Sequence, residues 1–188
     1  MVDLFQAALE VQRLCQSQGW QFCFIGGLAV QRWGDARETV DVDISLFTGF
    51  GEIDGYNEIL LQHFEPRIPD AAAFANERRV LLIRSRTGVG IDVSLAALPY
   101  EALVIQRSSY FDYPPGISLL TCSAEDLIVL KAFAGRGQDW VDVERVIARR
   151  TGELDWDYIR EQLRPLAELK EAPEILDQLE ARRVEAKR

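Results

Sequence analysis

The sequence is poor in histidine, in cysteine and in long apolar runs, and each shortage excludes a class of protein. A single histidine, His63, gives little basis for a mechanism that depends on a histidine base. The three cysteines, Cys15, Cys23 and Cys122, lie far apart beside apolar neighbours, which favours buried free thiols over disulfides or a zinc cluster. No apolar run approaches the ~20 residues of a membrane span, and the first residues lack the pattern of a signal peptide. We therefore expect a cytoplasmic protein without membrane contact.

Basic side chains are also in deficit. The 188 residues include 21 Lys and Arg against 30 Asp and Glu, a formal net charge of −9. Proteins that bind nucleic acid without sequence preference hold the phosphate backbone with clusters of Lys and Arg. The charge balance argues against such a binder, although it leaves room for a local basic groove around Arg78, Arg79, Arg84 and Arg86.

Hydrophobic periodicity divides the chain into an α/β unit, residues 1–120, and a helical C-terminal part, residues 121–188. Within the first unit the pattern predicts strands at 21–25, 41–47, 78–85 and 91–98, and two extended segments around a Pro-Pro-Gly turn. It predicts helices at 3–18, after the glycine pair, before His63 and after Pro99. Ser123 then opens a helix with a capping-box-like start, and helices at 138–150, 155–167 and 171–186 follow. The predicted fold class is α+β, a mixed-sheet core with a helical C-terminal part.

An acidic pair lies on one of the predicted strands. In DVDISLF, residues 41–47, strict alternation directs Asp41 and Asp43 to the same face with Cα atoms about 6–7 Å apart. Two carboxylates so placed suit Mg²⁺, which is commonly held by one or two carboxylates plus substrate phosphates. Two such ions ~3.5–4 Å apart activate an attacking hydroxyl and stabilise the leaving oxygen of an in-line displacement. Asp92, on the alternating strand 91–98, adds a third carboxylate if the two strands are neighbours, either as a metal ligand or as a general base.

A glycine pair, Gly26-Gly27, follows a short apolar strand and opens a predicted helix. Backbone N–H groups at the N-terminus of a helix form a natural phosphate cradle. Taken singly, the glycine pair reads as a plain turn and the acids as solvent-facing residues. Their joint order favours one site, because an apolar strand, a glycine turn, a helix, an acid–apolar–acid strand and a later Asp follow one another.

This order of motifs resembles the nucleotidyltransferase superfamily of the DNA polymerase beta type. The signature is an apolar residue before Gly26-Gly27, a spacer of residues 28–40, and then the acid–apolar–acid motif of Asp41 and Asp43. The resemblance implies a mixed-sheet nucleotidyltransferase core that binds an NTP, such as ATP, and Mg²⁺, with two ions expected. It makes Asp41 and Asp43 metal ligands and Asp92 the third ligand or the base.

The chain is more closely similar to the minimal bacterial nucleotidyltransferases of the AbiEii/MenT toxin type. In their first motif a glycine pair leads to an arginine, here Arg32, and their helical part carries a lysine motif and an Asp motif, here Lys131, Arg136, Asp139 and Asp142. Gly27 stands where that motif often has serine, and Lys131 has no second lysine beside it. The residues that this similarity assigns to the nucleotide are Gly26, Gly27, Arg32, Lys131, Arg136 and Asp139.

The residues themselves leave alternatives open for the cations. Lys131 shares a helical face with apolar residues, so it either extends along them to solvent or reaches a polar site. Asp139 and Asp142, spaced i and i+3, either pair with Lys131 or Arg136 or face solvent at a helix N-terminus. Arg37, in the spacer, either contacts a phosphate or acceptor or lies at the surface.

The leading hypothesis is a Mg²⁺-dependent nucleotidyltransferase that moves NMP from an NTP to an acceptor hydroxyl. The acceptor is left open between tRNA, a protein side chain and an antibiotic or other small molecule. The resemblance implies a component of a toxin–antitoxin system, with a cognate antitoxin protein as partner. One alternative is a catalytically silent module of the same fold that binds a nucleotide or a partner. A weaker alternative is a plain Mg²⁺ phosphohydrolase.

Overall fold

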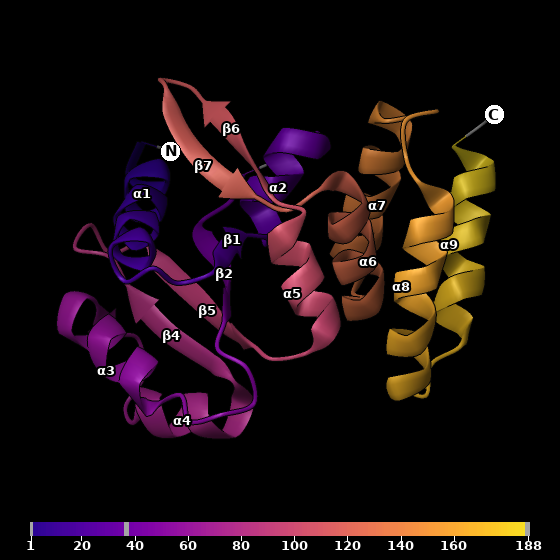
Figure 1. The fold of residues 1–188 in the computed structure, drawn as a ribbon. Helices are drawn as coiled ribbons and strands as arrows, with labels where there is room; N and C mark the ends of the chain where they lie inside the picture. Colours follow the sequence, from indigo (N-terminus) through magenta and orange to yellow (C-terminus); the bar gives the residue numbers. More distant parts are fainter. Residues whose placement is uncertain (1, 36–37, 187–188) are drawn as a thin grey trace. The chain divides into compact units, whose positions relative to one another are not determined.

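The computed structural model describes residues 2–35 and 38–186. The chain packs into two units (Figure 1), which we call the sheet unit, residues 1–28 and 38–122, and the helical unit, residues 29–37 and 123–188. Helix α2, Gly26–Trp33, begins in the sheet unit and continues into the helical unit. The predicted domain boundary after residue 120 stays a prediction.

The sheet unit is built on a mixed seven-stranded sheet with strand order β3-β4-β5-β2-β1-β7-β6. Strands β2 and β5 pair parallel, as do β1 and β7, and the other neighbours pair antiparallel. The fold class is α+β, as predicted. The strands are β1 Phe22–Phe24, β2 Asp41–Phe47, β3 Glu65–Pro66, β4 Val80–Arg84, β5 Gly90–Ala96, β6 Ser109–Tyr113 and β7 Ile117–Thr121; the helices wholly within this unit are α1 Val2–Ser17, α3 Asp54–His63, α4 Ala71–Arg78 and α5 Pro99–Gln106.

Alternation gives the neighbouring strands β4, β5 and β2 one face that is buried in the core and one that is more exposed. Across β4, β5 and β2, Leu81 is aligned with Val93 and Ile44, and all three side chains are buried in the main core. The next row on the opposite face consists of Leu82, Asp92 and Asp43. Since burial of one face fixes the strand register, the apolar residues that build the core also determine which side the acids occupy.

Two elements of the sheet unit are absent from the sequence prediction. Strand β3 is only two residues long, and its Pro66 reads as a loop residue because proline cannot donate to a ladder. Helix α4 has the sequence AAAFANER, which lacks a clear apolar stripe. Both elements are short and depend on contacts with β4, which carries them at the edge of the sheet.

The helical unit contains α6 Ala124–Ala134, α7 Gly137–Arg149, α8 Trp156–Leu169 and α9 Glu174–Glu185. Ser123 caps α6, as predicted, because its Oγ accepts a hydrogen bond from the Asp126 N–H at 3.1 Å. The core of the helical unit consists of buried aliphatic side chains, including Leu127, Ile128, Val143, Val146, Ile147, Ile159, Leu163 and Leu179.

The three cysteines are buried free thiols, as predicted. Burial raises the pKa of the Cys15 thiol to about 12. In the part of the chain that the structure describes, no helix is both long enough and apolar enough to span a membrane.

Candidate functional site

The three predicted carboxylates lie on one face of the sheet. Strand β2 runs parallel to β5 with Asp43 aligned with Asp92 and Asp41 aligned with Gly90. Aligned residues on neighbouring strands are about 4.8 Å apart in the plane of the sheet, and positions i and i+2 share a face. The condition set by the sequence, that the strands of Asp43 and Asp92 be neighbours, is therefore met.

The glycine pair packs directly against Asp43. Gly26 has φ +56°, and a Cβ at this position would collide with the Asp43 carboxylate, so both the backbone and the space demand glycine. The Gly27 N–H lies 3.4 Å from Asp43 Oδ2, and the Ile25 N–H donates to the Asp43 carbonyl at 3.0 Å. The N-terminus of α2 thus faces a carboxylate, which is an anion that such a terminus favours.

Gly27 is confined by a different residue. A Cβ on Gly27 would collide with the side chain of Thr39. Thr39 Oγ1 is itself buried and has no hydrogen-bond partner among the described residues. A serine at position 27 would compete with Thr39 for the same space, so glycine is the residue that fits this position.

Asp92 has a cationic neighbour that the sequence does not predict. Arg67 Nη2 lies 2.6 Å from Asp92 Oδ1, and about a quarter to a third of each side chain is exposed, 27% and 30%. Burial raises the pKa of Asp92 above its ordinary value, the Arg67 charge lowers it, and the Asp41 charge raises it. The influence of Asp41 on Asp92 agrees with their shared face.

The donor chemistry of this face suits a hard divalent cation. Asp41 and Asp43 offer carboxylate oxygens on one side of the sheet, and Mg²⁺ commonly takes its remaining ligands from phosphate and water. Among residues 2–35 and 38–186, no three carboxylate, imidazole or thiolate side chains gather as a ready-made metal cluster. Asp92 contacts the Arg67 guanidinium instead. Asp41 and Asp43 therefore supply the kind of ligand that the cation takes, and Asp92 has a cationic partner of its own.

In the helical unit, Lys131 is buried in an ion cluster. Its Nζ donates to Asp139 Oδ1 at 2.8 Å and lies 2.9 Å from Asp142 Oδ2. Lys131 is 8% exposed, Asp139 2% and Asp142 0%. Arg136, which is largely exposed, adds a bond of 2.7 Å from its Nε to Asp139 Oδ2. Although burial opposes ionisation, the bonds and charges of Arg136 and Lys131 hold the pKa of Asp139 below its usual range.

The other predicted cations are dispersed. In the helical unit the Arg32 guanidinium stacks 4.0 Å from the Trp33 ring, and Arg37 lies outside the described residues. In the sheet unit Arg79 donates to the Leu95 carbonyl, the Thr48 hydroxyl and the Gly49 carbonyl, so its guanidinium fastens a loop. Arg78 pairs with its neighbour Glu77 on the surface.

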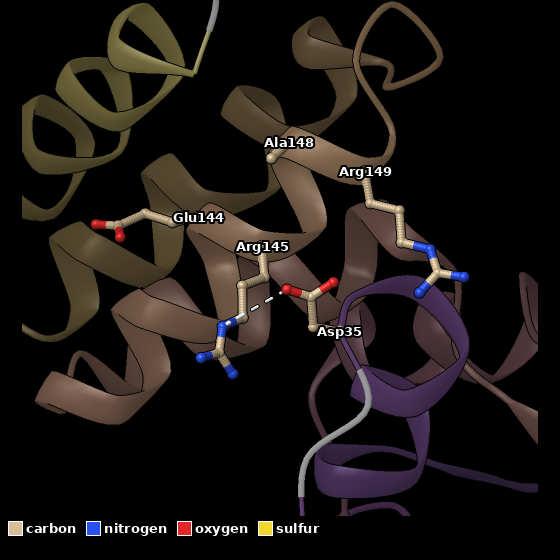
Figure 2. A pocket seen from close by; sticks show the side chains of 5 residues that line it. All are labelled: Asp35, Glu144, Arg145, Ala148 and Arg149. Carbon is tan, nitrogen blue, oxygen red and sulfur yellow. Dashed lines mark ion pairs between the residues drawn. The ribbon is translucent and has the colours of Figure 1, made fainter.

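A pocket in the helical unit contains none of the predicted site residues. Figure 2 shows that Asp35, at the end of α2, and residues of α7 line it. Arg145 Nε lies 3.9 Å from Asp35 Oδ2, and Arg149 Nη1 donates to the Gly34 carbonyl at 2.7 Å. The arginines of this pocket thus hold residues 34–35 against α7. The remaining lining residues are Glu144 and Ala148.

Solved structures with a similar fold are nucleotidyltransferase-like. An antigenic nucleotidyltransferase-like protein from Paracoccidioides brasiliensis superimposes with a TM-score of 0.50 at 19% identity, covering 95% of this chain and 93% of that one. The solution structure of the antibiotic-resistance factor ANT(2'')-Ia matches with a TM-score of 0.45 and 14% identity, covering 97% of this chain and 90% of that one. Its crystal structure with adenylyl-2''-tobramycin matches with a TM-score of 0.45, 16% identity and coverages of 94% and 95%. The fold of this chain is that of the nucleotidyltransferases.

The family follows from the sequence. Residues 11–187 match the family model described as nucleotidyl transferase AbiEii toxin, type IV toxin–antitoxin system. The chain belongs to this family and is a nucleotidyltransferase. A comparison with curated proteins finds no match.

Proposed function

We propose that the protein moves NMP from an NTP to an acceptor hydroxyl at the face formed by Asp41, Asp43 and Asp92. The observation that carries this proposal is the parallel, in-register pairing of β2 with β5, which aligns Asp43 with Asp92. Membership of the AbiEii family supports the reaction class. The spacing of the acids supports Mg²⁺ as the metal and an NTP as the donor.

Each of the three acids in the sheet unit has its own proposed role in the reaction. Asp41 and Asp43 would hold Mg²⁺, which supplies charge stabilisation at the α-phosphate and the leaving pyrophosphate when bound. The α2 N-terminus keeps Asp43 in place through the Gly27 N–H. Asp92, on the adjoining strand, is the third ligand or takes the proton of the attacking hydroxyl. Such positioning and charge stabilisation supply most of the catalysis in phosphoryl-type transfer.

For Lys131, Arg136 and Asp139 a role in nucleotide binding is proposed from the resemblance of their motifs. Lys131, Arg136 and Asp139 match the lysine and Asp motifs of similar bacterial enzymes. The tight cluster around Lys131 supports a role in which Asp139 and Asp142 hold the lysine in one rotamer. Gly26, Gly27 and Arg32 complete the proposed nucleotide contacts.

The direct test is transfer of label from α-labelled NTPs in the presence of Mg²⁺ and a cell extract. We expect transfer with the wild type and a loss of at least about a hundredfold with Asp43→Asn, because one metal-binding carboxylate is gone. Asp112→Asn is the matched control, since Asp112 is an exposed strand acid of the same unit. No transfer by the wild type, or equal transfer by Asp43→Asn, would refute the proposal. An Asp43→Asn variant with full biological effect would favour the silent binding module.

The same experiment identifies the acceptor. Label that is lost on ribonuclease treatment assigns an RNA such as tRNA, label lost on protease treatment assigns a protein, and label in the small-molecule fraction assigns an antibiotic-like hydroxyl. The toxin–antitoxin description of the family supports a cognate antitoxin partner. Growth arrest on expression of the wild type, absent with Asp43→Asn and relieved by the antitoxin, is the result expected for that pairing.

A further inference from the structure

Arg67 lies on the face of the sheet that carries Asp41, Asp43 and Asp92, in a space that Gly90 leaves open. It follows the edge strand β3, and its N–H donates to the Leu82 carbonyl at 2.9 Å. The register then continues from Leu82 to Asp92 and from Asp92 to Asp43. Arg67 therefore begins a row that crosses the three strands β4, β5 and β2 and ends at Asp43. Its side chain reaches Asp92 Oδ1 at 2.6 Å.

Gly90 supplies the space for the guanidinium. A Cβ on Gly90 would collide with Arg67 Nη1 and would lie 3.4 Å from Arg67 Cζ. The φ of Gly90 is outside the left-handed region, so the backbone does not require glycine there. Gly90 is the first residue of β5, and the contact with Arg67 gives a steric reason for glycine there. Gly90 is aligned with Asp41 and lies two residues before Asp92, so the guanidinium covers β5 on the face that carries these acids.

The pairing is of a kind that a second cation can displace. Arg67 Nη2 contacts Asp92 Oδ1, and both side chains are partly exposed to water. Partly exposed ion pairs of this type contribute little in water, because solvent screens the two charges.

From this geometry we propose that Arg67 is the resident counter-ion of Asp92 and competes with the divalent cation for its Oδ1. The guanidinium neutralises the third carboxylate while the cation is away and must withdraw, or share the carboxylate, when the cation is bound. The proposal rests on the proposed function, in which Asp92 belongs to the cation site. Arg67 is thus a positioning residue that sets the affinity for the cation.

The test measures Mn²⁺ binding by calorimetry, without nucleotide, to the full chain. We expect Arg67→Met to bind Mn²⁺ about three- to tenfold more tightly than the wild type, because a competing and repelling charge is gone. Arg78→Met is the matched control, since it removes one positive charge from the surface of the same unit. It should change the affinity by less than about twofold at 0.15 M salt, where distant exposed charges are screened.

Further variants distinguish the effect of the space at Gly90 from the effect of the Arg67 charge. Gly90→Ala keeps the arginine but expels its guanidinium, so it should tighten Mn²⁺ binding in the same direction. The double variant Arg67→Met with Gly90→Ala should bind no more tightly than Arg67→Met alone, because both changes remove one interaction. Arg67→Lys retains a charge and should lie between the wild type and Arg67→Met. Thermal unfolding of each variant verifies that it is folded.

The outcomes are distinct from those of the transfer assay. If Arg67→Met binds Mn²⁺ no more tightly than Arg78→Met, or if no variant binds it, the competition is refuted, whatever the wild type transfers. Tighter binding by Arg67→Met together with absent transfer by the wild type would support Arg67 as the counter-ion and reject the proposed reaction. Additive effects of Arg67→Met and Gly90→Ala on the Mn²⁺ affinity would also refute the claim that Gly90 provides the space for the Arg67 guanidinium.

Discussion

Replacement of Lys131 by methionine removes the one buried cation of the helical-unit cluster while leaving its acids in place. The change deletes the contacts of 2.8 Å and 2.9 Å to Asp139 and Asp142, which are 2% and 0% exposed. Breaking a buried ion pair by removing one partner costs about 3–5 kcal/mol, because a buried charge is left uncompensated. For a chain of this size the loss corresponds to a fall in Tm of about 6–20 °C.

The pH dependence of stability should weaken at the same time. In the wild type the depressed pKa of Asp139 contributes stability that is present above the ordinary Asp value and is lost as pH falls through the lower folded value. Without Lys131, the Arg136 bond and charge still lower the pKa of Asp139, but burial opposes them more fully, so this pKa should move up toward its ordinary value. The variant should therefore lose less stability than the wild type as pH falls through the acidic range.

Urea unfolding followed by tryptophan fluorescence measures both effects. Three of the four tryptophans, Trp33, Trp140 and Trp156, belong to the helical unit, so the signal reports chiefly on it. Lys170→Met is the control, since Lys170 is exposed and caps carbonyls at the end of α6; it should cost no more than about 1 kcal/mol. A loss below about 1 kcal/mol for Lys131→Met, with an unchanged pH slope, would refute the argument.

Two further substitutions test local packing and a buried network. Gly27→Ala should cost about 1–3 kcal/mol of stability through its clash with the Thr39 side chain; Thr39→Ala should restore part of it, and Gly55→Ala, with open space around the helix position, should be neutral or stabilising. Equal urea midpoints for Gly27→Ala and Gly55→Ala would contradict the steric account. Tyr158→Phe should cost about 1.5–3 kcal/mol, because its hydroxyl donates at 2.7 Å to the fully buried Asp126. A change under about 0.5 kcal/mol in the same measurement would show that the bond is dispensable.

The strands that carry the acids were predictable because alternation is a strong signal when one face is buried. Residues 41–47 form β2 as predicted, and Asp92 lies on β5 beside it. The sequence left the neighbour relation between the two strands as a condition. Pairing across some fifty residues depends on the whole sheet order, which local periodicity does not encode.

Arg67, by contrast, has no local signal. Its reach to Asp92 depends on the register of β3 with β4 and of β4 with β5. In the sequence it stands between two prolines in a stretch that reads as a loop. Only Gly90, a glycine placed at the start of a strand without a backbone reason, gives a hint that another group needs the space.

For Lys131 the sequence supplied both readings and the structure selects one of them. The lysine pairs with Asp139 and Asp142 rather than extending to solvent. Helical spacing showed that the two acids share a turn, but their burial depends on α6 packing against α7. Whether this cluster also contacts a nucleotide stays a prediction.

The path of helix α2 bears on how the protein can be dissected. The polypeptide leaves the sheet unit after Leu28, returns at Glu38 and leaves again after Cys122, so neither unit is one uninterrupted stretch of chain. A single cut after Cys122 would remove all the helices with which the second half of α2 is grouped. The first turn of α2 would still pack against Asp43. Deletion fragments are therefore poor tools for assigning activities to either unit. Point substitutions preserve the connections that a truncation would destroy.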